Sequence, residues 1–267
     1  MSIEKEVSEL LAIMAKMRDP KEGCAWTREQ TYHSLVRHTI EEAYEVADSI
    51  ESGDLDGLKG ELADLLNQVV FYSRLAEEEG RFDFKDIVAH LTQKLIDRHP
   101  DVFKTQDNKS VEFLESQWET LKQKERVGTE AKSILDGVVK NLPGLSVANK
   151  LQVRASSVGF DWQDKRDVLA KLKSEIVELE EAFDQEDRDA ILDEVGDVIF
   201  SCVNFIRHMK ADSEQVMRAS NNKFETRFRN LEKILKEQGL QIEKQSPEQL
   251  EEIWAQVKIP QRRHPAT

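Results

Sequence analysis

The stretch TIEEAYEVADSIESGDLDGLKGELADLLNQVVFYS, residues 39–73, predicts two consecutive helices with a glycine between them. Glu41, Glu42 and Glu45 fall on the first helix, and Glu61 and Asp64 fall on the second. Because a helix turns by about 100° per residue, acids three or four positions apart lie on one face. If the helices pack antiparallel, these carboxylates meet at one place. They would repel one another and raise one another's pKa, so a divalent cation between them is the simplest expectation.

An apolar stripe on the second helix places its two acids beside the buried face rather than on a fully solvated one. The stripe consists of Leu62, Leu65, Leu66, Val69 and Val70. The alternative interpretation is an ordinary wet surface, because a chain with a formal net charge of −14 carries acids on many exposed faces. A second occurrence of the pattern further along the chain favours the metal-binding interpretation.

The composition is typical of an all-α protein and argues against several classes of partner. Of the 267 residues, 34% are charged and 7% are aromatic, which leaves little of the alternation that strands need. The negative charge disfavours duplex DNA and anionic membranes, so we expect no nucleic-acid or membrane partner. A polyphosphate ligand would need metal ions or a local basic cluster. Two dissimilar cysteines and a charged start indicate a cytoplasmic protein without a disulfide framework or a zinc site.

Periodicity and turn residues predict two helical modules, residues 1–126 and 147–267, joined by a linker at 127–146 that includes a short helix. In the first module, helices are expected from residue 3 to before Asp19 and at 35–52, 55–79, 84–97 and 111–126. In the second module, they are expected at 147–157, 165–183, 187–210, 211–238 and 247–257.

The same features occur twice in one order, which indicates an internal duplication. Four acids of the second half lie 133 positions after four acids of the first. The pairs are Glu42 and Glu175, Glu45 and Glu178, Glu61 and Glu194, and Asp64 and Asp197. Three further segments also match: CAWTREQ around Trp26 with FDWQDK around Trp162, KLIDR (Lys94, Arg98) with KFETR (Lys223, Arg227), and QWETLKQK around Trp118 with IWAQVK around Trp254.

The two copies differ at two positions near the acids. Ser174 stands where the first copy has Glu41, so the second copy lacks the leading acid. Gly196 lies between Glu194 and Asp197, and its missing side chain has two equally good explanations. One is close approach of backbone or ligand, and the other is tight helix packing.

Carboxylates without cysteine or convergent histidine select a hard cation, Mg²⁺ or Mn²⁺. Such ions would neutralise phosphates and lower the pKa of a bridging water, which makes a nucleophile near neutral pH. An acid that is not fully occupied by metal would serve as general base.

Basic residues follow both acidic hairpins. Lys223 and Arg227, one turn apart, would clamp a triphosphate, and Lys171, one turn before the first acid of its module, would reach the same phosphates. Lys94 and Arg98 would do this in the first copy. The alternative interpretation of either lysine–arginine pair is that its side chains lie on a solvent-exposed helix face and bind no ligand.

Aromatic residues lie in the loops before the acidic helices. Trp26, Phe160 and Trp162 would stack on a nucleobase or pack in the core.

Together these residues resemble the MazG family of nucleoside triphosphate pyrophosphohydrolases, all-α proteins. The resemblance covers nearly the whole chain and rests on CAWTREQTYHSL, IEEAYEV, GELADLLNQVVFYSRLAEEEGRFDF, VGFDW, DEVGDV and NNKFETRF. It implies Mg²⁺-dependent cleavage of nucleoside triphosphates between the α- and β-phosphates, with broad base tolerance. It also implies helix bundles that are completed by dimerisation, so a homodimer is expected.

By motif, the resemblance assigns metal ligands in both copies. They are Glu42, Glu45, Glu61 and Asp64 in the first and Glu175, Glu178, Glu194 and Asp197 in the second. The second copy is the expected main catalytic site because it is richer in nearby cations, although both copies working or a regulatory first copy remain open. The expected substrate-binding residues are Lys171, Lys223, Arg227, Trp162, Lys94 and Arg98.

Other classes fit the sequence less well. A di-iron carboxylate protein would carry Glu three residues before a helical histidine, and none of the 6 histidines has it. No glycine is followed by lysine, so a P-loop is unsupported. The remaining alternative is a non-catalytic helical adaptor that binds metal or a protein partner.

Overall fold

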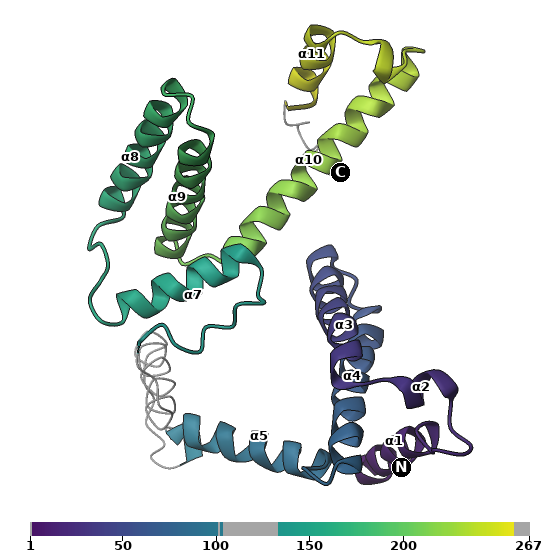
Figure 1. Cartoon of the computed structure of the whole chain (residues 1–267). Coiled ribbons are helices and arrows are strands. Elements are labelled where there is room, and N and C mark those ends of the chain that lie inside the picture. The colour runs from purple at the N-terminus through teal and green to yellow at the C-terminus, as the bar shows by residue number, and fades with distance from the viewer. Residues whose placement is uncertain (1, 101, 104–132, 259–267) are drawn as a thin grey trace. The chain divides into compact units, whose positions relative to one another are not determined.

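The computed structural model describes residues 2–100, 102–103 and 133–258. Every element in this part of the chain is a helix, which confirms the predicted all-α class. The chain divides into two compact units, Met1–Leu121 and Lys122–Thr267 (Figure 1). The predicted limits of the modules and linker stay a prediction, because residue 126 lies outside the described residues. None of the described helices is long and apolar enough to cross a membrane.

The first unit is built on the helical hairpin that residues 39–73 predict. Its elements are α1 Ile3–Met17, α2 Ala25–Glu29, α3 Tyr32–Ser52, α4 Leu58–Glu78 and α5 Phe84–Arg98. The start of α3 is a capping box, in which Thr31 and Ser34 each accept a hydrogen bond from the backbone N–H of the other. Gly53 ends α3 with φ 77°, a left-handed conformation that glycine adopts without steric cost.

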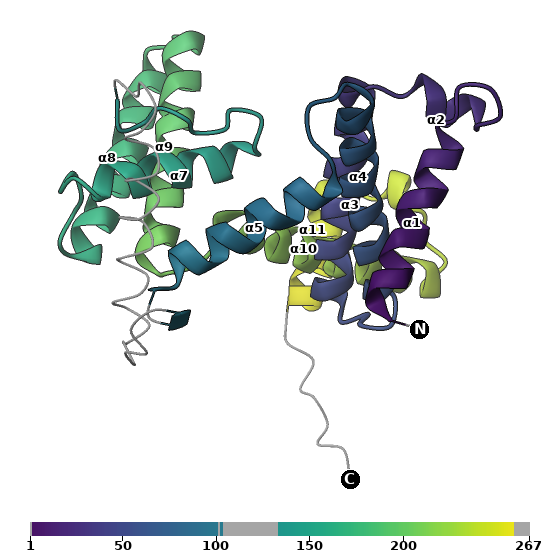
Figure 2. The same ribbon diagram turned by 90° about the horizontal axis from the view of Figure 1, so that it is seen from below.

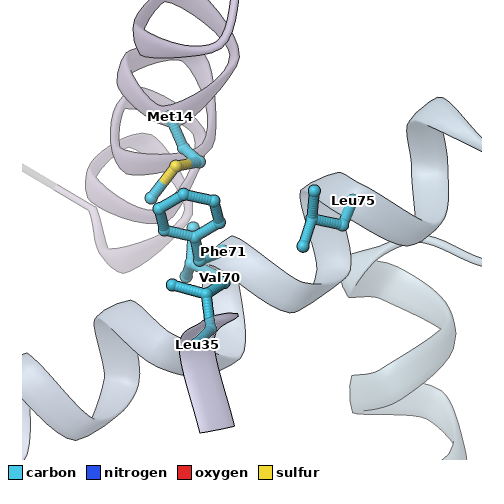
Figure 3. Close-up of a cluster of buried hydrophobic side chains, with 5 residues drawn as sticks. All are labelled: Met14, Leu35, Val70, Phe71 and Leu75. Atoms are coloured by element: carbon cyan, nitrogen blue, oxygen red, sulfur yellow. The ribbon is translucent and has the colours of Figure 1, made fainter. Parts of the chain in front are cut away.

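A buried cluster holds the hairpin of the first unit against α1. Figure 3 shows it as Met14 of α1, Leu35 of α3, and Val70, Phe71 and Leu75 of α4. In both ribbon views α1 lies beside α4 (Figures 1 and 2). The predicted acids lie six to ten residues along their own helices from the nearest residue of this cluster, which is about two to three helical turns. The core thus fixes the register of the hairpin without covering its acids.

The second unit repeats the hairpin and adds a long helix. Its elements are α7 Gly144–Ser156, α8 Lys165–Asp184, α9 Arg188–His208, α10 Ser213–Glu237, the 3₁₀ turn η2 Ile242–Lys244, and α11 Pro247–Lys258. Asp187 caps α9, because one carboxylate oxygen accepts the backbone N–H groups of Asp189 and Ala190. The helix α7 packs on α9, as α1 packs on α4 in the first unit.

The helix α10 is anchored at both ends. At its start, the Ser213 hydroxyl donates to the Leu145 carbonyl, and the Ser146 N–H donates to Glu214. Near its end, Leu231 and Leu235 pack with Ile253 of α11 in a separate buried cluster. Its middle turns therefore extend away from the hairpin of the same unit, as Figure 1 shows.

Burial follows the predicted duplication. Positions 133 apart in the two hairpins have matching exposure: Leu35 and Val168 are both 1% exposed, and Val70 and Val203 are 0% and 1% exposed. Each of the four hairpin helices runs without a break through its core position and its acids. The 133-residue offset between the two copies therefore holds from the acids into the core. At these core positions the two hairpins pack alike.

Some predicted boundaries shift. The helix α4 begins at Leu58 rather than at 55, because Asp54 accepts the N–H of Gly57 and closes a turn there. The loop after α1 contains the short helix α2, which the turn residues did not indicate. The predicted helix at 111–126 and the match around Trp118 lie outside the described residues.

Candidate active site

Three carboxylates of the second hairpin have oxygen atoms that all lie within 4.8 Å of one another. They belong to Glu175 of α8 and to Glu194 and Asp197 of α9. Glu175 is only 5% exposed. The fourth predicted acid, Glu178, lies one turn after Glu175 and is close enough for its charge to raise the pKa of Glu194. The structure thus brings the four predicted acids of the second module together.

Glu194 is the acid whose surroundings most clearly suit a cation. Burial is the main cause that raises its pKa above the ordinary carboxyl value, and the charges of Glu178, Asp197 and Glu175 add to it. Its Oε2 atom is buried and has no hydrogen-bond partner among the described residues. A buried carboxylate oxygen among other carboxylates is costly unless a cation meets it. An all-oxygen donor set suits Mg²⁺ or Mn²⁺, so these residues fit the implied metal.

Lys171 already lies at these acids. Its Nζ atom is 2.8 Å from Oε1 of Glu175 and 3.8 Å from Oε1 of Glu178. The hydrogen bond to Glu175 is the main reason why the pKa of Lys171 is raised. The lysine predicted to contact phosphates is therefore next to two predicted metal ligands.

The first hairpin gathers its acids in the same way. Oxygen atoms of Glu42, Glu45 and Glu61 lie within 4.8 Å of one another. Burial, then the charge of Asp64, then Glu45 raise the pKa of Glu42, which places Asp64 in the same electrostatic cluster. At the position equivalent to Lys171 stands His38, whose Nδ1 lies 3.6 Å from Oε2 of Glu41. The first module therefore has the acids without the lysine.

A cavity of about 410 Å³ adjoins the acids of the second module. Its lining includes Lys171, Glu175 and Asp197 from the acid cluster. It also includes the aromatic rings of Phe160 and Trp162 from the loop before α8. Two predicted metal ligands, one lysine and the predicted stacking residues thus line one cavity.

An ion-pair network borders this cavity. The two carboxylate oxygens of Asp161 accept hydrogen bonds from Arg207 at 2.9 and 2.6 Å, and His208 Nε2 lies 3.0 Å away. Although burial opposes it, the hydrogen bonds from Arg207 and His208 hold the pKa of Asp161 below its usual value. The network ties the loop that carries Phe160 and Trp162 to the end of α9.

Four predicted phosphate-binding cations are not brought to the acids of their own unit. Lys223 and Arg227 lie in the middle of α10, which extends away from the hairpin of its unit (Figure 1), and neither residue lines the cavity. Lys94 and Arg98 lie near the C-terminal end of α5. This helix follows the C-terminal end of α4, whereas Glu61 and Asp64 lie near the N-terminal end of α4 (Figure 1). Their role in phosphate binding stays a prediction.

The two positions at which the copies differ have distinct outcomes. The Ser174 hydroxyl donates to the carbonyl of Lys171 at 2.7 Å, so it serves the helix backbone. A Cβ atom added to Gly196 would meet no atom within 4 Å. Among the described residues no atom packs closely on Gly196, so tight helix packing is wrong as the explanation for this glycine.

Sequence reasoning missed the residues at the far end of the cavity, Gln152, Asn204 and Arg207. A comparison of the two hairpins at the 133-residue spacing would have pointed to Asn204. This comparison pairs Asn204 with the buried Phe71, so a polar residue stands where the other copy has a core residue. Gln152 carries no such signal, since it lies on a helix outside the hairpin.

Two helical hairpins related by duplication, each with clustered carboxylates that suit a hard divalent cation, define a class of all-α proteins. The MazG nucleotide pyrophosphohydrolase domain matches residues 30–103 and 163–231, one segment over each hairpin. The chain is 42% identical over 259 residues to the nucleoside triphosphate pyrophosphohydrolase of Escherichia coli strain K12, covering 95% of this chain and 97% of that protein.

A second relative is the nucleoside triphosphate pyrophosphohydrolase/pyrophosphatase MazG of Thermotoga maritima. It is 40% identical over 250 residues, which cover 94% of each chain. The chain therefore belongs to the MazG nucleotide pyrophosphohydrolase family, and the predicted family and enzyme class are confirmed.

Proposed function

We propose that this protein hydrolyses nucleoside triphosphates between the α- and β-phosphates to a nucleoside monophosphate and pyrophosphate, mainly in its second module. The observation that carries the proposal is that Glu175 and Asp197 line one cavity with Lys171 and two aromatic rings. Such a space suits a ligand with an anionic end and a flat apolar end. Both relatives are named as nucleoside triphosphate pyrophosphohydrolases, which supports the same reaction.

Each residue has a role that follows from its position. Glu175, Glu194 and Asp197 would hold Mg²⁺ through their clustered oxygens. The bound ion would neutralise phosphate charge and lower the pKa of a water. Glu178 lies outside the closest cluster and its side chain is 48% exposed, which suits an acid that accepts the proton of that water. Lys171 would turn from the acids to the phosphates.

The first module is proposed to bind the cation without being the main hydrolytic site. Its acids cluster, but His38 replaces the lysine, and Phe71 fills the position that faces the cavity in the second module. A weak or regulatory role there is compatible with this proposal, whereas equal turnover is not.

A homodimer is part of the proposal, and exposed apolar side chains on both hairpins support it. They include Leu62 and Leu66 on α4, Ile176 and Val177 on α8, and Ile199 on α9, each between 43% and 50% exposed. Rows of half-exposed aliphatic residues on hairpin helices are typical of bundles completed by another chain. A second copy would also be a source for Lys223 and Arg227. Light scattering on the full chain tests this, and a monomer at micromolar concentration would contradict it.

The test of the activity is pyrophosphate release from a panel of NTPs and dNTPs with Mg²⁺. Asp197→Asn and Asp64→Asn are matched variants, because the two residues occupy equivalent positions in the two modules. We expect Asp197→Asn to lower kcat by about 100-fold or more and Asp64→Asn to retain most turnover. Loss only with Asp64→Asn would contradict the assignment to the second module. No pyrophosphate from any nucleotide, despite Mn²⁺ binding, would favour the non-catalytic adaptor.

A further inference from the structure

The cavity of the second module continues along one face of α9. Asp197, Ser201, Asn204 and Arg207 line it at spacings of three or four residues. Asn204 is seven residues beyond Asp197, which is about 10 Å along the helix axis. This is roughly the separation between the α-phosphate of a nucleotide and the far edge of its base. With the phosphates at the acids, the base edge would reach Asn204.

The amide of Asn204 has a fixed orientation. Its Oδ1 atom accepts hydrogen bonds from Nε and Nη2 of Arg207 at 3.1 and 2.7 Å. The other side of the amide, the Nδ2 group, therefore remains a donor and has no hydrogen bond to a described residue. Arg207 is itself held by the carboxylate of Asp161. Asn204 is only 6% exposed and lines the cavity, and its Nδ2 is not among the buried atoms without a partner, so this donor is open to the cavity and available to a ligand.

Gln152 offers the complementary group. Its Nε2 donates to the carbonyl of Phe200 at 2.9 Å, which directs Oε1 away from that bond. This oxygen is buried and has no partner among the described residues, and the side chain lines the same cavity. Gln152 is 7% exposed. The far end of the cavity thus holds an open donor and, behind it, a buried acceptor that meets a ligand once the side chain of Gln152 moves toward it.

The Watson–Crick edge of every nucleobase presents a donor beside an acceptor, and proteins that bind single bases combine contacts to this edge with stacking on aromatic rings. We propose, building on the proposed function, that Asn204 and Gln152 hydrogen-bond the edge of the substrate's base while Phe160 or Trp162 stacks on it. Asn204 is a specificity-determining residue. Arg207 and Asp161 are positioning residues that keep the donor of Asn204 turned toward the base.

The first module has no asparagine at the position equivalent to Asn204. Phe71 stands at the position of Asn204, is buried at 3% exposure, and meets Trp26 edge to face at 6.5 Å between ring centroids. Figure 3 shows its ring packed in the cluster with Met14 and Leu35. Where the second module has a polar amide at a cavity, the first has core. This difference assigns base recognition to the second module alone.

The test compares ATP, GTP, CTP and UTP, first as substrates with Mg²⁺ and then as ligands in fluorescence titrations of the tryptophans with Ca²⁺. Asn204→Leu should raise KM and Kd by about tenfold, the effect of one lost hydrogen bond, with a smaller change in kcat. Asn204→Asp, which replaces the donor with an acceptor, should change the ranking of the four bases. Arg207→Met should weaken base discrimination without removing any atom of Asn204. Asn230→Leu, an exposed asparagine on α10, is the matched control.

Tripolyphosphate separates the base end of the cavity from the phosphate end, because it has no base. Its competitive inhibition with Mg²⁺ should be unchanged in the Asn204 and Arg207 variants. Wild-type base ranking and KM in Asn204→Asp and Asn204→Leu would overturn the inference, as would an equal loss of tripolyphosphate inhibition. Failure of the proposed hydrolysis is a different result, namely no pyrophosphate from wild type. The fluorescence titrations would still show whether Asn204 reads the base.

Discussion

The ammonium of Lys171 lies 2.8 Å from a carboxylate oxygen of Glu175, one helical turn further along α8. The same ammonium is 3.8 Å from Glu178, so one lysine partly neutralises two of the predicted Mg²⁺ ligands from within the chain. The equivalent residue of the first module, His38, contacts Glu41 instead. The lysine and a bound metal ion would therefore compete for the same carboxylates in the second module only.

Lys171→Met should separate metal binding from turnover. Removal of the competing ammonium should tighten Mn²⁺ binding by about two- to fivefold, because the side chain is partly exposed and the ion pair is screened. Pyrophosphate release should fall, because the phosphates lose a cation. Mn²⁺ titration without nucleotide and a steady-state assay measure the two effects. Lys173→Met, an exposed neighbour on α8, is the control. Weaker Mn²⁺ binding in Lys171→Met would contradict the competition.

The hairpins and their acids could be predicted from the sequence because they depend on local rules. The three- and four-residue spacing of the acids fixes which of them share a helix face. The apolar stripe beside them is only partly buried within the chain, since Leu62, Leu66 and Val69 are 37–49% exposed. The 133-residue repeat of Glu42 at Glu175 and of Asp64 at Asp197 then shows that the same face recurs. The structure confirms the all-α class and brings both sets of acids together.

The cavity could not be predicted, because it depends on contacts between elements far apart in sequence. Gln152 reaches it from α7, and its acceptor is free only because its amide nitrogen bonds to Phe200 on α9. Asp161 fixes Arg207 from a loop 46 residues earlier. Hydrophobic periodicity gives the face of each helix and not the rotation of a neighbouring helix or the amide orientation of a side chain.

Glu194→Gln should stabilise the protein when no divalent cation is present. The pKa of Glu194 is raised by burial and by four neighbouring carboxylates, so its charge opposes folding at neutral pH. In EDTA at pH 7, the variant should have the higher Tm. In Mg²⁺ the order should reverse, because the wild type gains binding energy that the amide cannot supply.

Thermal unfolding followed by circular dichroism measures this crossover. Glu180→Gln, which removes an exposed acid from α8, should shift Tm equally in EDTA and in Mg²⁺. A lower Tm for Glu194→Gln in EDTA would show that groups of the protein stabilise the Glu194 carboxylate without a cation.

Asp161→Asn should destabilise the second unit in a pH-dependent manner. Arg207 and His208 hold the pKa of Asp161 below its usual value, so its stabilising contribution is present above the unfolded pKa of about 3.9 and is lost as the pH falls through the lower folded pKa. At pH 7 the loss of the charged hydrogen bonds should cost about 1–3 kcal/mol. At pH 3 the difference between wild type and variant should shrink.

Tryptophan fluorescence during unfolding follows this region, because Trp162 adjoins Asp161. Asp184→Asn is the control, since Asp184 is exposed and has no hydrogen bond to the described residues. The same loss of Tm at pH 3 and pH 7 would mean that Asp161 acts through its shape and not through its charge.

Gly196→Ala should raise stability and weaken substrate binding at once. A methyl group there meets no atom within 4 Å, and alanine is favoured over glycine in a helix interior by about 1 kcal/mol, so Tm should rise by about 2–4 °C. Gly196 lies between Glu194 and Asp197, so the same methyl group would crowd a metal–phosphate complex that approaches α9, and KM should rise. Gly60→Ala, beside Glu61 in the first module and equally open, should leave KM unchanged. A fall in Tm would reveal a packing contact, and an unchanged KM in Gly196→Ala would remove close approach of the ligand as the reason for glycine at this position.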